Sequence, residues 1–308
     1  MKALLIGCGN IGALYDLNTN EIKTHAKALS FIPSIVVSLF DENVSQAKKI
    51  ASLYHYKLVE DKATIKLADF ELVIIASPTK THFEWLCKCF ESNVKLVICE
   101  KPLSTNKKEL EELEIKYKNS NTKVVVNYIR RFQQAYIELK QLIEKESKTP
   151  LQILVKYQRG ITNNFSHAAD LIQFFYGQCE FSNLNITDKI FDEFENDPTC
   201  SFTGKYGKIP ISVIGLANVK YSYFEIEIFY KNKKIAITNS GDNIRVISAK
   251  EAQNFYLQLT ETEFEKTDIL RNYMKNVYEI VEDVFSGKLE DNFIESIMMG
   301  NEISKIIN

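Results

Sequence analysis

The chain has 308 residues, of which 45% are hydrophobic and 25% are charged, an ordinary globular composition at about twice the usual length of one domain. Its formal net charge of -2 leaves no basic excess for binding nucleic acid or anionic membranes, so neither partner is expected. Glycines interrupt the apolar start of the sequence, and no apolar stretch reaches the roughly 18 residues of a membrane helix. We therefore expect a cytoplasmic protein of two domains.

The cysteines lack the dense spacing of a secreted disulfide scaffold and the paired CxxC motifs of a zinc site. We expect reduced thiols and no metal. The six positions are Cys8, Cys87, Cys89, Cys99, Cys179 and Cys200.

The first 126 residues alternate short apolar runs with helical segments. The runs are rich in Val, Ile and Leu, as expected of parallel strands that are buried on both faces. This alternation predicts an α/β fold, a doubly wound parallel sheet of the Rossmann type, over residues 1–126. The expected strands are 3–6, 35–40, 72–76, 96–99 and 123–126, and the expected helices include 44–53, 83–92 and 107–119.

A glycine motif follows the first expected strand. Residues 7–12 read Gly-Cys-Gly-Asn-Ile-Gly and fit GxGxxG, in which the first glycine permits a tight turn, the second admits a pyrophosphate and the third lets helix and strand pack closely. Because N–H groups at a helix start face a bound phosphate, the motif predicts a dinucleotide site. The expected contacts are Gly7, Gly9, Asn10, Ile11 and Gly12.

Asp41 ends the second expected strand, where a carboxylate accepts hydrogen bonds from both ribose hydroxyls and repels a 2′-phosphate. NAD is therefore expected rather than NADP. Asp41 lies further along the chain than the usual spacing of about 20 residues, and the polar segment 16–24 accounts for the excess. Two questions stay open. The segment either covers the ligand or is a surface insertion. Asp41 either binds the ribose hydroxyls or caps the next helix.

Beyond residue 127 the pattern changes to strand-like segments joined by short polar turns. Residues 223–230 alternate clearly between apolar and polar side chains, as in a sheet with one buried face. We expect a second domain, 127–308, of α+β type with a mostly antiparallel open sheet; its terminal helices pack within it or back on the first domain. The expected strands are 151–158, 209–217, 223–230, 234–238, 244–248 and 255–259, and the expected helices are 133–148, 165–175 ending at Gly177, 268–285 and 293–307.

Three further stretches, in order, resemble the glucose-fructose oxidoreductase / inositol dehydrogenase family (Gfo/Idh/MocA). Residues 75–84 contain a pattern similar to A-[TS]-P-x-x-x-H, residues 99–104 contain E-K-P, and residues 127–132 resemble aromatic-x-R-R-[FY]. The resemblance covers essentially the whole chain and is strongest over residues 1–135. It implies further cofactor contacts at Ser77, Pro78, Thr79, His82, Glu100, Lys101 and Arg130.

In this family the lysine of E-K-P lies beside the nicotinamide and the substrate hydroxyl, and the resemblance gives that role to Lys101. The chemistry agrees, because oxidation of a secondary alcohol requires removal of the hydroxyl proton, and a lysine near a positively charged ring loses its own proton more readily. A solvated surface lysine is the alternative.

The fourth resemblance is partial. Residues 163–170 match the family's D-x-x-x-H-x-x-D at its last two polar positions, which makes His167 the implied proton shuttle and Asp170 its partner or an anchor. The first position is Asn163, an amide that cannot take up a proton but can orient a sugar hydroxyl. A structural hydrogen bond for His167 and a surface position for Asp170 are the alternatives.

Further substrate contacts are implied at Tyr128 and Arg130. Guanidinium groups bind cofactor, carboxylate or phosphate groups, and we expect one of Arg130 and Arg131 to form a structural ion pair instead. His82 borders the nicotinamide or caps its helix, and His25 is expected to be structural.

The sequence thus predicts an NAD(H)-dependent oxidoreductase that moves a hydride to or from a secondary alcohol or ketone of a sugar, polyol or nucleotide-sugar. Lys101 and His167 are the expected catalytic residues, and the exposed face of the second sheet is the expected homo-oligomer surface. Elimination or epimerisation with retained NAD is one alternative, and a non-catalytic NAD-binding regulator is another. The substrate and the direction of reaction stay open.

Overall fold

The computed structural model describes residues 1–146, 148–178, 180–251 and 257–307. The chain divides into two compact units, of which unit 1 comprises Met1–Phe132 with Arg271–Gly300 and unit 2 comprises Gln133–Leu270 with Asn301–Asn308. The sequence placed the boundary near residue 126. Residues 271–300, which follow the second sheet in the chain, cluster with the first unit.

Unit 1 is built on a parallel sheet of six described strands in the order β3-β2-β1-β4-β5-β6. Its central strands are apolar throughout, and every residue of β4 and β5 is buried. This is the doubly wound order of a Rossmann fold, so the predicted class is confirmed. The strands are β1 (Lys2–Ile6), β2 (Val36–Phe40), β3 (Lys57–Val59), β4 (Leu72–Ile75), β5 (Leu96–Cys99) and β6 (Lys123–Val126).

Helical segments of unit 1 follow the strands, as the alternating sequence requires. Thr24 caps α1, since its side chain accepts a hydrogen bond from the Lys27 N–H. The segments are η1 (Asn10–Leu14), α1 (His25–Ser30), α2 (Val44–Tyr54), η2 (Lys62–Thr64), η3 (Leu67–Asp69), η4 (Thr79–Thr81), α3 (His82–Glu91), α4 (Lys107–Lys118), η5 (Ile129–Phe132) and α7 (Tyr273–Phe285). The last helix, α8 (Phe293–Ile307), begins in unit 1, and its residues from Asn301 onward are assigned to unit 2.

Side chains close the β6 edge of this sheet. The Val124 N–H donates to Asp291 at 2.9 Å and the Val126 N–H donates to Asn292 at 2.7 Å. The Asn292 amide in turn donates to the Val126 carbonyl at 2.9 Å. The segment that follows α7 therefore satisfies an edge that would otherwise offer unpaired backbone groups to another chain.

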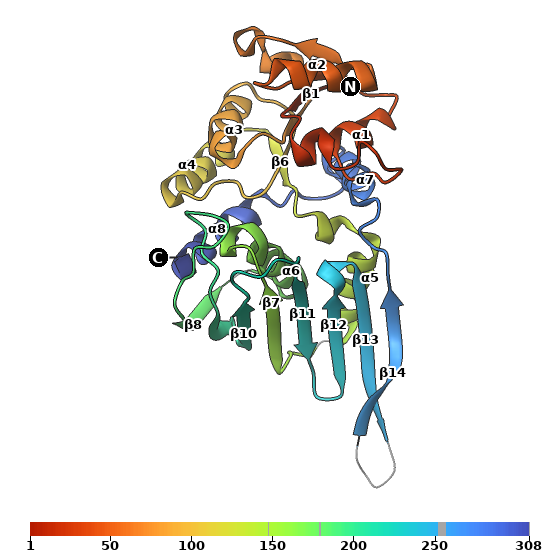
Figure 1. Ribbon diagram of the computed structural model, residues 1–308, viewed down its shortest axis with the longest axis vertical. Helices are drawn as coiled ribbons and strands as arrows, with labels where there is room; N and C mark the ends of the chain where they lie inside the picture. The colour runs from red at the N-terminus through yellow and green to blue at the C-terminus, as the bar shows by residue number, and fades with distance from the viewer. Residues whose placement is uncertain (147, 179, 252–256, 308) are drawn as a thin grey trace. The chain divides into compact units, whose positions relative to one another are not determined.

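Unit 2 is built on a sheet of eight described strands in the order β14-β13-β12-β11-β7-β10-β9-β8 (Figure 1). Its pairs are antiparallel except β7 with β10, which confirms a mostly antiparallel sheet. The strands are β7 (Gln152–Tyr157), β8 (Phe181–Ile186), β9 (Phe202–Tyr206), β10 (Ile209–Gly215), β11 (Phe224–Phe229), β12 (Lys233–Thr238), β13 (Asn243–Glu251) and β14 (Leu257–Lys266); the helical segments are α5 (Gln134–Glu146), η6 (Ile161–Phe165), α6 (Ser166–Tyr176) and η7 (Asn239–Gly241).

Three described strands, β3, β8 and β9, were not predicted. β8 contains two asparagines, and Gly204 interrupts β9 where a Cβ would lie 2.8 Å from the Ser182 carbonyl, so neither strand shows a strong apolar pattern. The prediction that α7 begins at residue 268 was wrong, because Asp268 has a positive φ of 57° and the helix starts at Tyr273. The predicted strand 255–259 lies partly outside the described residues.

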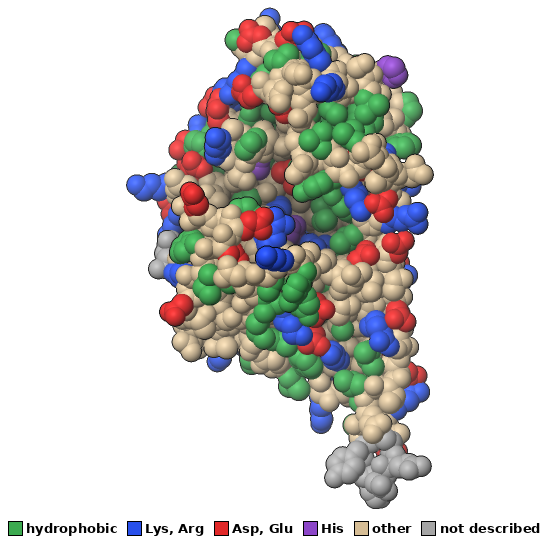
Figure 2. Space-filling view, in the orientation of Figure 1, with side chains coloured by type: hydrophobic (Ala, Val, Ile, Leu, Met, Phe, Trp, Pro, Cys, Tyr) green, Lys and Arg blue, Asp and Glu red, His purple; other side chains and the backbone are tan. Residues whose placement is uncertain are grey.

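Acidic and basic side chains are interspersed over the face shown in Figure 2, in keeping with the small net charge. Among the helices that the structure describes, none combines the length and apolar character needed to cross a membrane. The cysteines of the described residues are free thiols, and Cys179 lies outside that part of the chain.

Candidate cofactor and substrate sites

The glycine turn after β1 is shaped by two close backbone approaches. Gly7 has a φ of 98°, and a Cβ there would lie 2.6 Å from the backbone of Ala76. A Cβ at Gly12 would overlap the Gly7 carbonyl oxygen. At Gly9, by contrast, an added Cβ meets nothing within 4 Å. The first and third glycines are therefore required for packing, and the second leaves the backbone open to a ligand, as a pyrophosphate requires.

Asp41, at the end of β2, is bound to this turn. Its carboxylate accepts a hydrogen bond from the Cys8 N–H at 2.7 Å and another from the Asn43 N–H at 2.7 Å. The cap of α2 is Asn43, whose side chain accepts from the Gln46 N–H at 3.1 Å, so Asp41 is not the helix cap. The arrangement puts a carboxylate where the ribose of a dinucleotide would be read.

The Cys8 thiol is fully buried inside the glycine turn. Burial, with the charge and hydrogen bond of Asp41, raises the pKa of Cys8. The thiol is therefore protonated at neutral pH and is not a nucleophile.

His82, at the start of α3, joins the segments that follow β4 and β5. Nε2 lies 2.8 Å from the Ser77 carbonyl, and Nδ1 lies 2.8 Å from the Pro102 carbonyl. The residue is 1% exposed. Burial, the largest influence, lowers the pKa of His82, although both carbonyl groups and the charge of Glu100 oppose it. The imidazole thus connects the Ser77-Pro78-Thr79 turn with the E-K-P turn.

Glu100 and Lys101 follow β5 directly. Glu100 is 8% exposed, and its Oε1 accepts hydrogen bonds from His25 and Asn127. Burial acts to raise the pKa of Glu100, but the hydrogen bond and charge of His25, the hydrogen bond from Asn127 and the charge of Lys101 together hold it below the ordinary value. Lys101 is half-buried, and its bond to Pro102 is cis. A carboxylate and a lysine thus stand together at the carboxyl edge of the sheet.

The residues that follow β6 are buried as well. Tyr128 is 3% exposed and Arg130 is 8% exposed. Arg131 forms an ion pair with Glu295, with 2.9 Å between Nη1 and Oε2. Arg131 therefore forms a structural ion pair.

The remaining predicted residues lie in unit 2, on η6 and α6. His167 is partly exposed and packs edge-on against Phe224, with 6.5 Å between ring centroids. Asp170, one turn later, is 1% exposed, so it is not a surface acid. The Asn163 amide donates to the Arg159 carbonyl at 3.1 Å.

Asp197 was missed by sequence reasoning. Its carboxylate accepts hydrogen bonds from the Thr162 and Asn163 N–H groups, both at 2.7 Å. A Cβ at Gly160 would overlap this carboxylate. Because Asp197 lies far along the chain from Asn163, in a loop with no motif, only the structure connects them.

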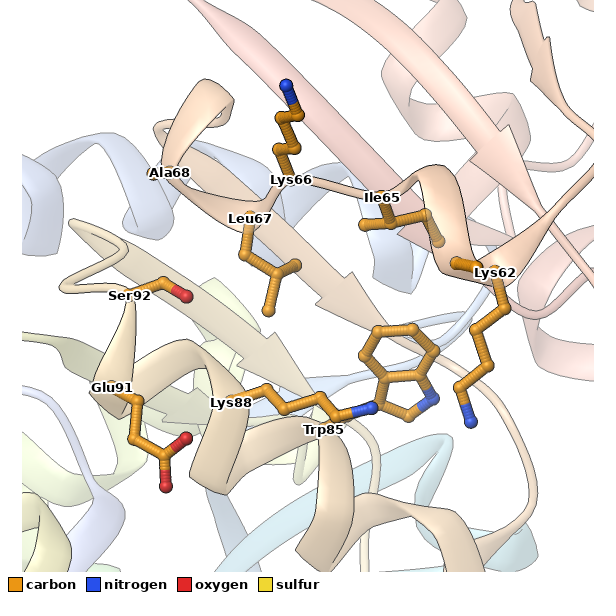
Figure 3. Close-up of a pocket in the computed structure, with 10 residues that line it drawn as sticks. Lys62, Ile65, Lys66, Leu67, Ala68, Trp85, Lys88, Glu91 and Ser92 are labelled. Carbon is orange, nitrogen blue, oxygen red and sulfur yellow. The ribbon is translucent and has the colours of Figure 1, made fainter.

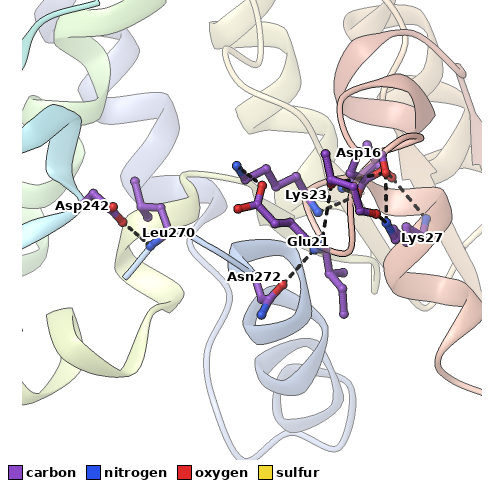
Figure 4. A network of polar contacts seen from close by, with 10 residues as sticks. Asp16, Glu21, Lys23, Lys27, Asp242, Leu270 and Asn272 are labelled. Atoms are coloured by element: carbon purple, nitrogen blue, oxygen red, sulfur yellow. Dashed lines mark hydrogen bonds and ion pairs between the residues drawn. The ribbon is translucent and has the colours of Figure 1, made fainter. Parts of the chain in front are cut away.

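The polar segment 16–24 is an ordered loop closed on Asp16 (Figure 4). The fully buried Asp16 accepts hydrogen bonds from the Lys23 N–H at 2.6 Å, the Thr24 N–H at 2.9 Å and the Thr24 hydroxyl at 2.9 Å. The Ile22 N–H donates to the Asn272 side chain at 2.9 Å, before α7. The loop therefore connects the glycine turn to α1 and also contacts the α7 segment.

A surface pocket of about 420 Å³ lies on the flank of α3 (Figure 3). Lys62 and Lys88 lie 4.9 and 5.3 Å from the Trp85 ring centroid and both pair with Glu84. None of the predicted site residues lines this pocket. Lys62 and Lys88 cover an aromatic core residue and pair with Glu84, and we do not assign the cofactor to this pocket.

The structure brings the predicted cofactor residues of unit 1 to the segments that follow five strands, β1, β2, β4, β5 and, for Arg130, β6. The carboxyl edge of the strands is where open α/β sheets bind ligands. Asn163, His167 and Asp170 share one turn and helix of unit 2. Within the described part of the chain, no group of three or more His, Cys, Asp or Glu side chains could hold a metal ion.

This sheet order, with a glycine turn after β1 and an acid after β2, defines a dinucleotide-binding Rossmann unit. Residues 1–128 match the Gfo/Idh/MocA family, described as an oxidoreductase family with an NAD-binding Rossmann fold. The match covers the glycine and E-K-P motifs and confirms the resemblance over that segment, while Arg130 and Arg131 lie just beyond it.

One curated relative is an inositol 2-dehydrogenase of Saccharopolyspora erythraea, 29% identical over 151 residues, which are 47% of this chain and 41% of that protein. The chain thus spans about two fifths of that relative's length. A UDP-N-acetylglucosamine 3-dehydrogenase from Acidithiobacillus ferrooxidans has a similar structure, with a TM-score of 0.78, 14% identity, and coverage of 99% of this chain and 96% of that one.

An oxidoreductase from Agrobacterium radiobacter, solved with NAD+, L-tartaric acid and magnesium, aligns with a TM-score of 0.73, 15% identity, and coverage of 98% and 94%. At such identities the likeness of the solved structures concerns the fold.

Proposed function

We propose that the protein is an NAD(H)-dependent dehydrogenase or reductase acting on a secondary alcohol or ketone of a sugar, polyol or nucleotide-sugar. The observation that carries the proposal is the carboxyl edge of the β1-β2-β4-β5 sheet, where the open Gly9 backbone, the Asp41 carboxylate and Lys101 follow neighbouring strands. The inositol and UDP-N-acetylglucosamine dehydrogenases among the similar proteins support a sugar-like substrate.

Each proposed site residue has a role that follows from the chemistry of its side chain. When bound, the nicotinamide cofactor supplies the hydride acceptor or donor. Lys101 takes up the substrate hydroxyl proton at Nζ during oxidation and returns it during reduction. His167 exchanges the proton with solvent, Asn163 orients a hydroxyl, and Tyr128, Arg130 and Asp170 complete the substrate contacts.

Asp41 favours NAD over NADP in this proposal, because its carboxylate repels a 2′-phosphate. We place the activity in the cytoplasm and assign homo-oligomer formation to the exposed face of the second sheet. That face carries charged side chains in ion pairs, such as Lys234 with Glu227 and Lys156 with Glu225.

The proposal is tested by replacing Lys101 with Met, which keeps the length of the side chain but removes its proton-transfer group. Turnover on a panel of sugars, polyols and nucleotide-sugars should fall by about 10²-fold or more, the usual contribution of general acid–base catalysis. NADH affinity, measured by fluorescence titration, should change by less than about threefold, since Lys101 is not the residue that reads the ribose. Unchanged turnover would remove Lys101 from the proposed mechanism.

Asn163 favours one second candidate, a reaction without net redox change. Because its amide cannot accept a proton, the chain lacks one acid of the family pattern, and transient oxidation could serve an elimination or epimerisation. Such an enzyme retains its cofactor. Absorbance near 340 nm in the purified protein, together with product formation without added NAD, would favour this candidate over net dehydrogenation.

A further inference from the structure

The imidazole of His25 is fully buried, and both of its ring nitrogens have partners. Nδ1 lies 2.9 Å from the Tyr278 hydroxyl on α7, and Nε2 lies 2.9 Å from Oε1 of Glu100. The same oxygen accepts a hydrogen bond from Nδ2 of Asn127 at 2.7 Å. Side chains from α1, α7 and the end of β6 therefore form a continuous chain of polar contacts that ends on one carboxylate.

The tautomer of His25 follows from these partners. An ionised Glu100 can only accept, so Nε2 carries the ring proton that it donates to the carboxylate. In the neutral ring Nδ1 is then an acceptor, and the Tyr278 hydroxyl donates to it. Tyr278 thus fixes which side of the imidazole faces Glu100.

Joining three elements through such a cluster costs free energy, because a charged group is removed from water. Apolar side chains of similar volume at these buried positions would hold α1, α7 and the sheet together with no charge to desolvate. What the polar cluster adds is a carboxylate held in one orientation, and that carboxylate immediately precedes Lys101.

We propose that His25 is a positioning residue for Lys101: with Asn127 it holds the Glu100 carboxylate at the point where the chain turns from β5 into Lys101. The inference rests on the proposed function, in which Lys101 handles the substrate proton. It assigns to α1 and α7 a part in the chemistry that the motifs at the sheet edge do not include.

The expected effect of losing His25 follows from the electrostatics around Glu100. Burial acts most strongly and raises the pKa of Glu100, and the His25 hydrogen bond is the first influence that opposes it. Without His25 the carboxyl group takes up a proton nearer to neutral pH, and Lys101 loses the negative neighbour that favours its ammonium form.

Other titratable groups near the cluster do not replace that charge. Burial raises the pKa of Tyr56, Tyr273 and Tyr278, so these hydroxyls are uncharged at neutral pH. Asp16 and Arg130 also act on Tyr273, but Glu100 is the carboxylate that His25 and Asn127 contact.

The reactivity of the Lys101 amine tests the inference in the full-length protein without any substrate. Acetic anhydride labelling at pH 7, followed by peptide mass spectrometry, reports the neutral fraction of the amine, with exposed Lys57 as the internal reference. His25→Leu should raise Lys101 labelling at least about threefold, the effect of half a pKa unit. Glu100→Gln, which keeps the shape of the side chain, should raise it to a similar extent.

Rescue and control variants separate positioning from simple support of the fold. His25→Gln keeps an N–H donor for Glu100 and should return labelling to near the wild-type rate. Tyr56→Phe is the matched control, because its hydroxyl donates to the Ala26 carbonyl on the same helix, at 2.6 Å, without touching Glu100. It should lower stability while leaving Lys101 labelling and turnover unchanged.

Kinetics supply the second measurement. At pH 7, His25→Leu should raise kcat in the oxidation direction by up to about threefold, in step with the neutral fraction of Lys101, with KM and NADH affinity within about twofold. Lys101 labelling at the wild-type rate in both His25→Leu and Glu100→Gln would overturn the inference. A Tyr56→Phe variant that raises Lys101 labelling as much as His25→Leu does would also overturn it. If the wild type turns over none of the panel substrates, the proposed function fails while the labelling still decides the role of His25.

Discussion

Asp41 binds two backbone N–H groups, one from the glycine turn and one from the start of α2. Its carboxylate is therefore held rigidly before any ribose arrives, which favours discrimination between cofactors. Replacing Asp41 with Ser removes the charge that repels a 2′-phosphate. We expect the preference for NAD over NADP, measured as the ratio of kcat/KM values, to fall at least about tenfold, or about 1.4 kcal/mol.

Asp41→Asn is the control for this prediction, because it removes the charge but keeps one acceptor oxygen for the two N–H groups of Cys8 and Asn43. A similar loss of preference in both variants would assign discrimination to charge. An unaltered preference in both would show that another residue reads the ribose.

His82 gives the protein an acid-sensitive contact. Its pKa is lowered on folding, chiefly by burial, so as pH falls below its ordinary value of 6.5 the unfolded chain takes up a proton that the folded chain resists. The free energy of unfolding should therefore decrease between about pH 6.5 and 5. His82→Gln should be less stable at pH 7.5 but show a flatter dependence in this window, as measured by urea unfolding.

This pH window isolates His82 from Glu100. Glu100 also has a lowered pKa, but from an ordinary value of 4.5, so its contribution is present at higher pH and is lost only as pH falls through its own folded value. Equal slopes for wild type and His82→Gln between pH 6.5 and 5 would contradict the assignment to His82.

The candidate site was predictable where a residue type is required by local backbone geometry. Gly7 and Gly12 are read from the sequence because any side chain would collide with neighbouring backbone. Asp197 and Tyr278 could not be read in this way. Their roles depend on partners distant in the sequence, and no local pattern distinguishes a buried acceptor from a surface acid.

At the level of elements, the loop 16–24 is held by one buried acceptor. Asp16→Ala would leave two N–H groups and the Thr24 hydroxyl without their partner, at a cost of about 2–4 kcal/mol in the free energy of unfolding. Asp16→Asn keeps one acceptor oxygen and should cost less. Urea unfolding of both variants checks the prediction, with Thr19→Ala as an exposed control in the same loop.

If Asp16→Ala, Asp16→Asn and Thr19→Ala all changed the free energy of unfolding by an equally small amount, other contacts would hold the loop, for example the hydrogen bond between Ile22 and Asn272. The sequence showed that this segment was an addition to the usual spacing. It did not show that Asp16 folds it, because a polar run with Asn, Thr and Lys is equally typical of a solvated surface loop.

Elements with strong periodicity were predicted well, as in the central strands of the first sheet and in α6, which ends at Gly177 as expected. Edge strands were predicted poorly. β8 has one buried residue, Phe181, and its Leu184 and Ile186 are only half-buried, so its apolar signal is weak.

At the level of the whole molecule, unit 1 is assembled from two parts of the chain. The later part supplies core residues such as Met274, Val277 and Phe293, each fully buried, and the side chains that close the β6 edge. We therefore predict that a fragment of residues 1–132 alone shows no cooperative thermal transition and self-associates, as judged by circular dichroism and gel filtration.

Joining residues 271–300 to that fragment through a flexible linker should restore a cooperative transition. A fragment of residues 1–132 that is monomeric and melts cooperatively would contradict the prediction. The sequence predicted two domains and left open whether the terminal helices join the second or the first, because a sequence pattern marks where elements lie along the chain but not which core each one joins.

The discontinuity of unit 1 also determines when its parts can meet during synthesis. The strands of the first sheet leave the ribosome early, but the residues that close the β6 edge and supply Tyr278 to His25 follow the whole of the second sheet. At ordinary rates of translation this delay is roughly ten to thirty seconds. Throughout that interval the nascent chain exposes an open strand edge, and the contacts from Tyr278 through His25 to Glu100 can be completed only after Tyr278 has emerged.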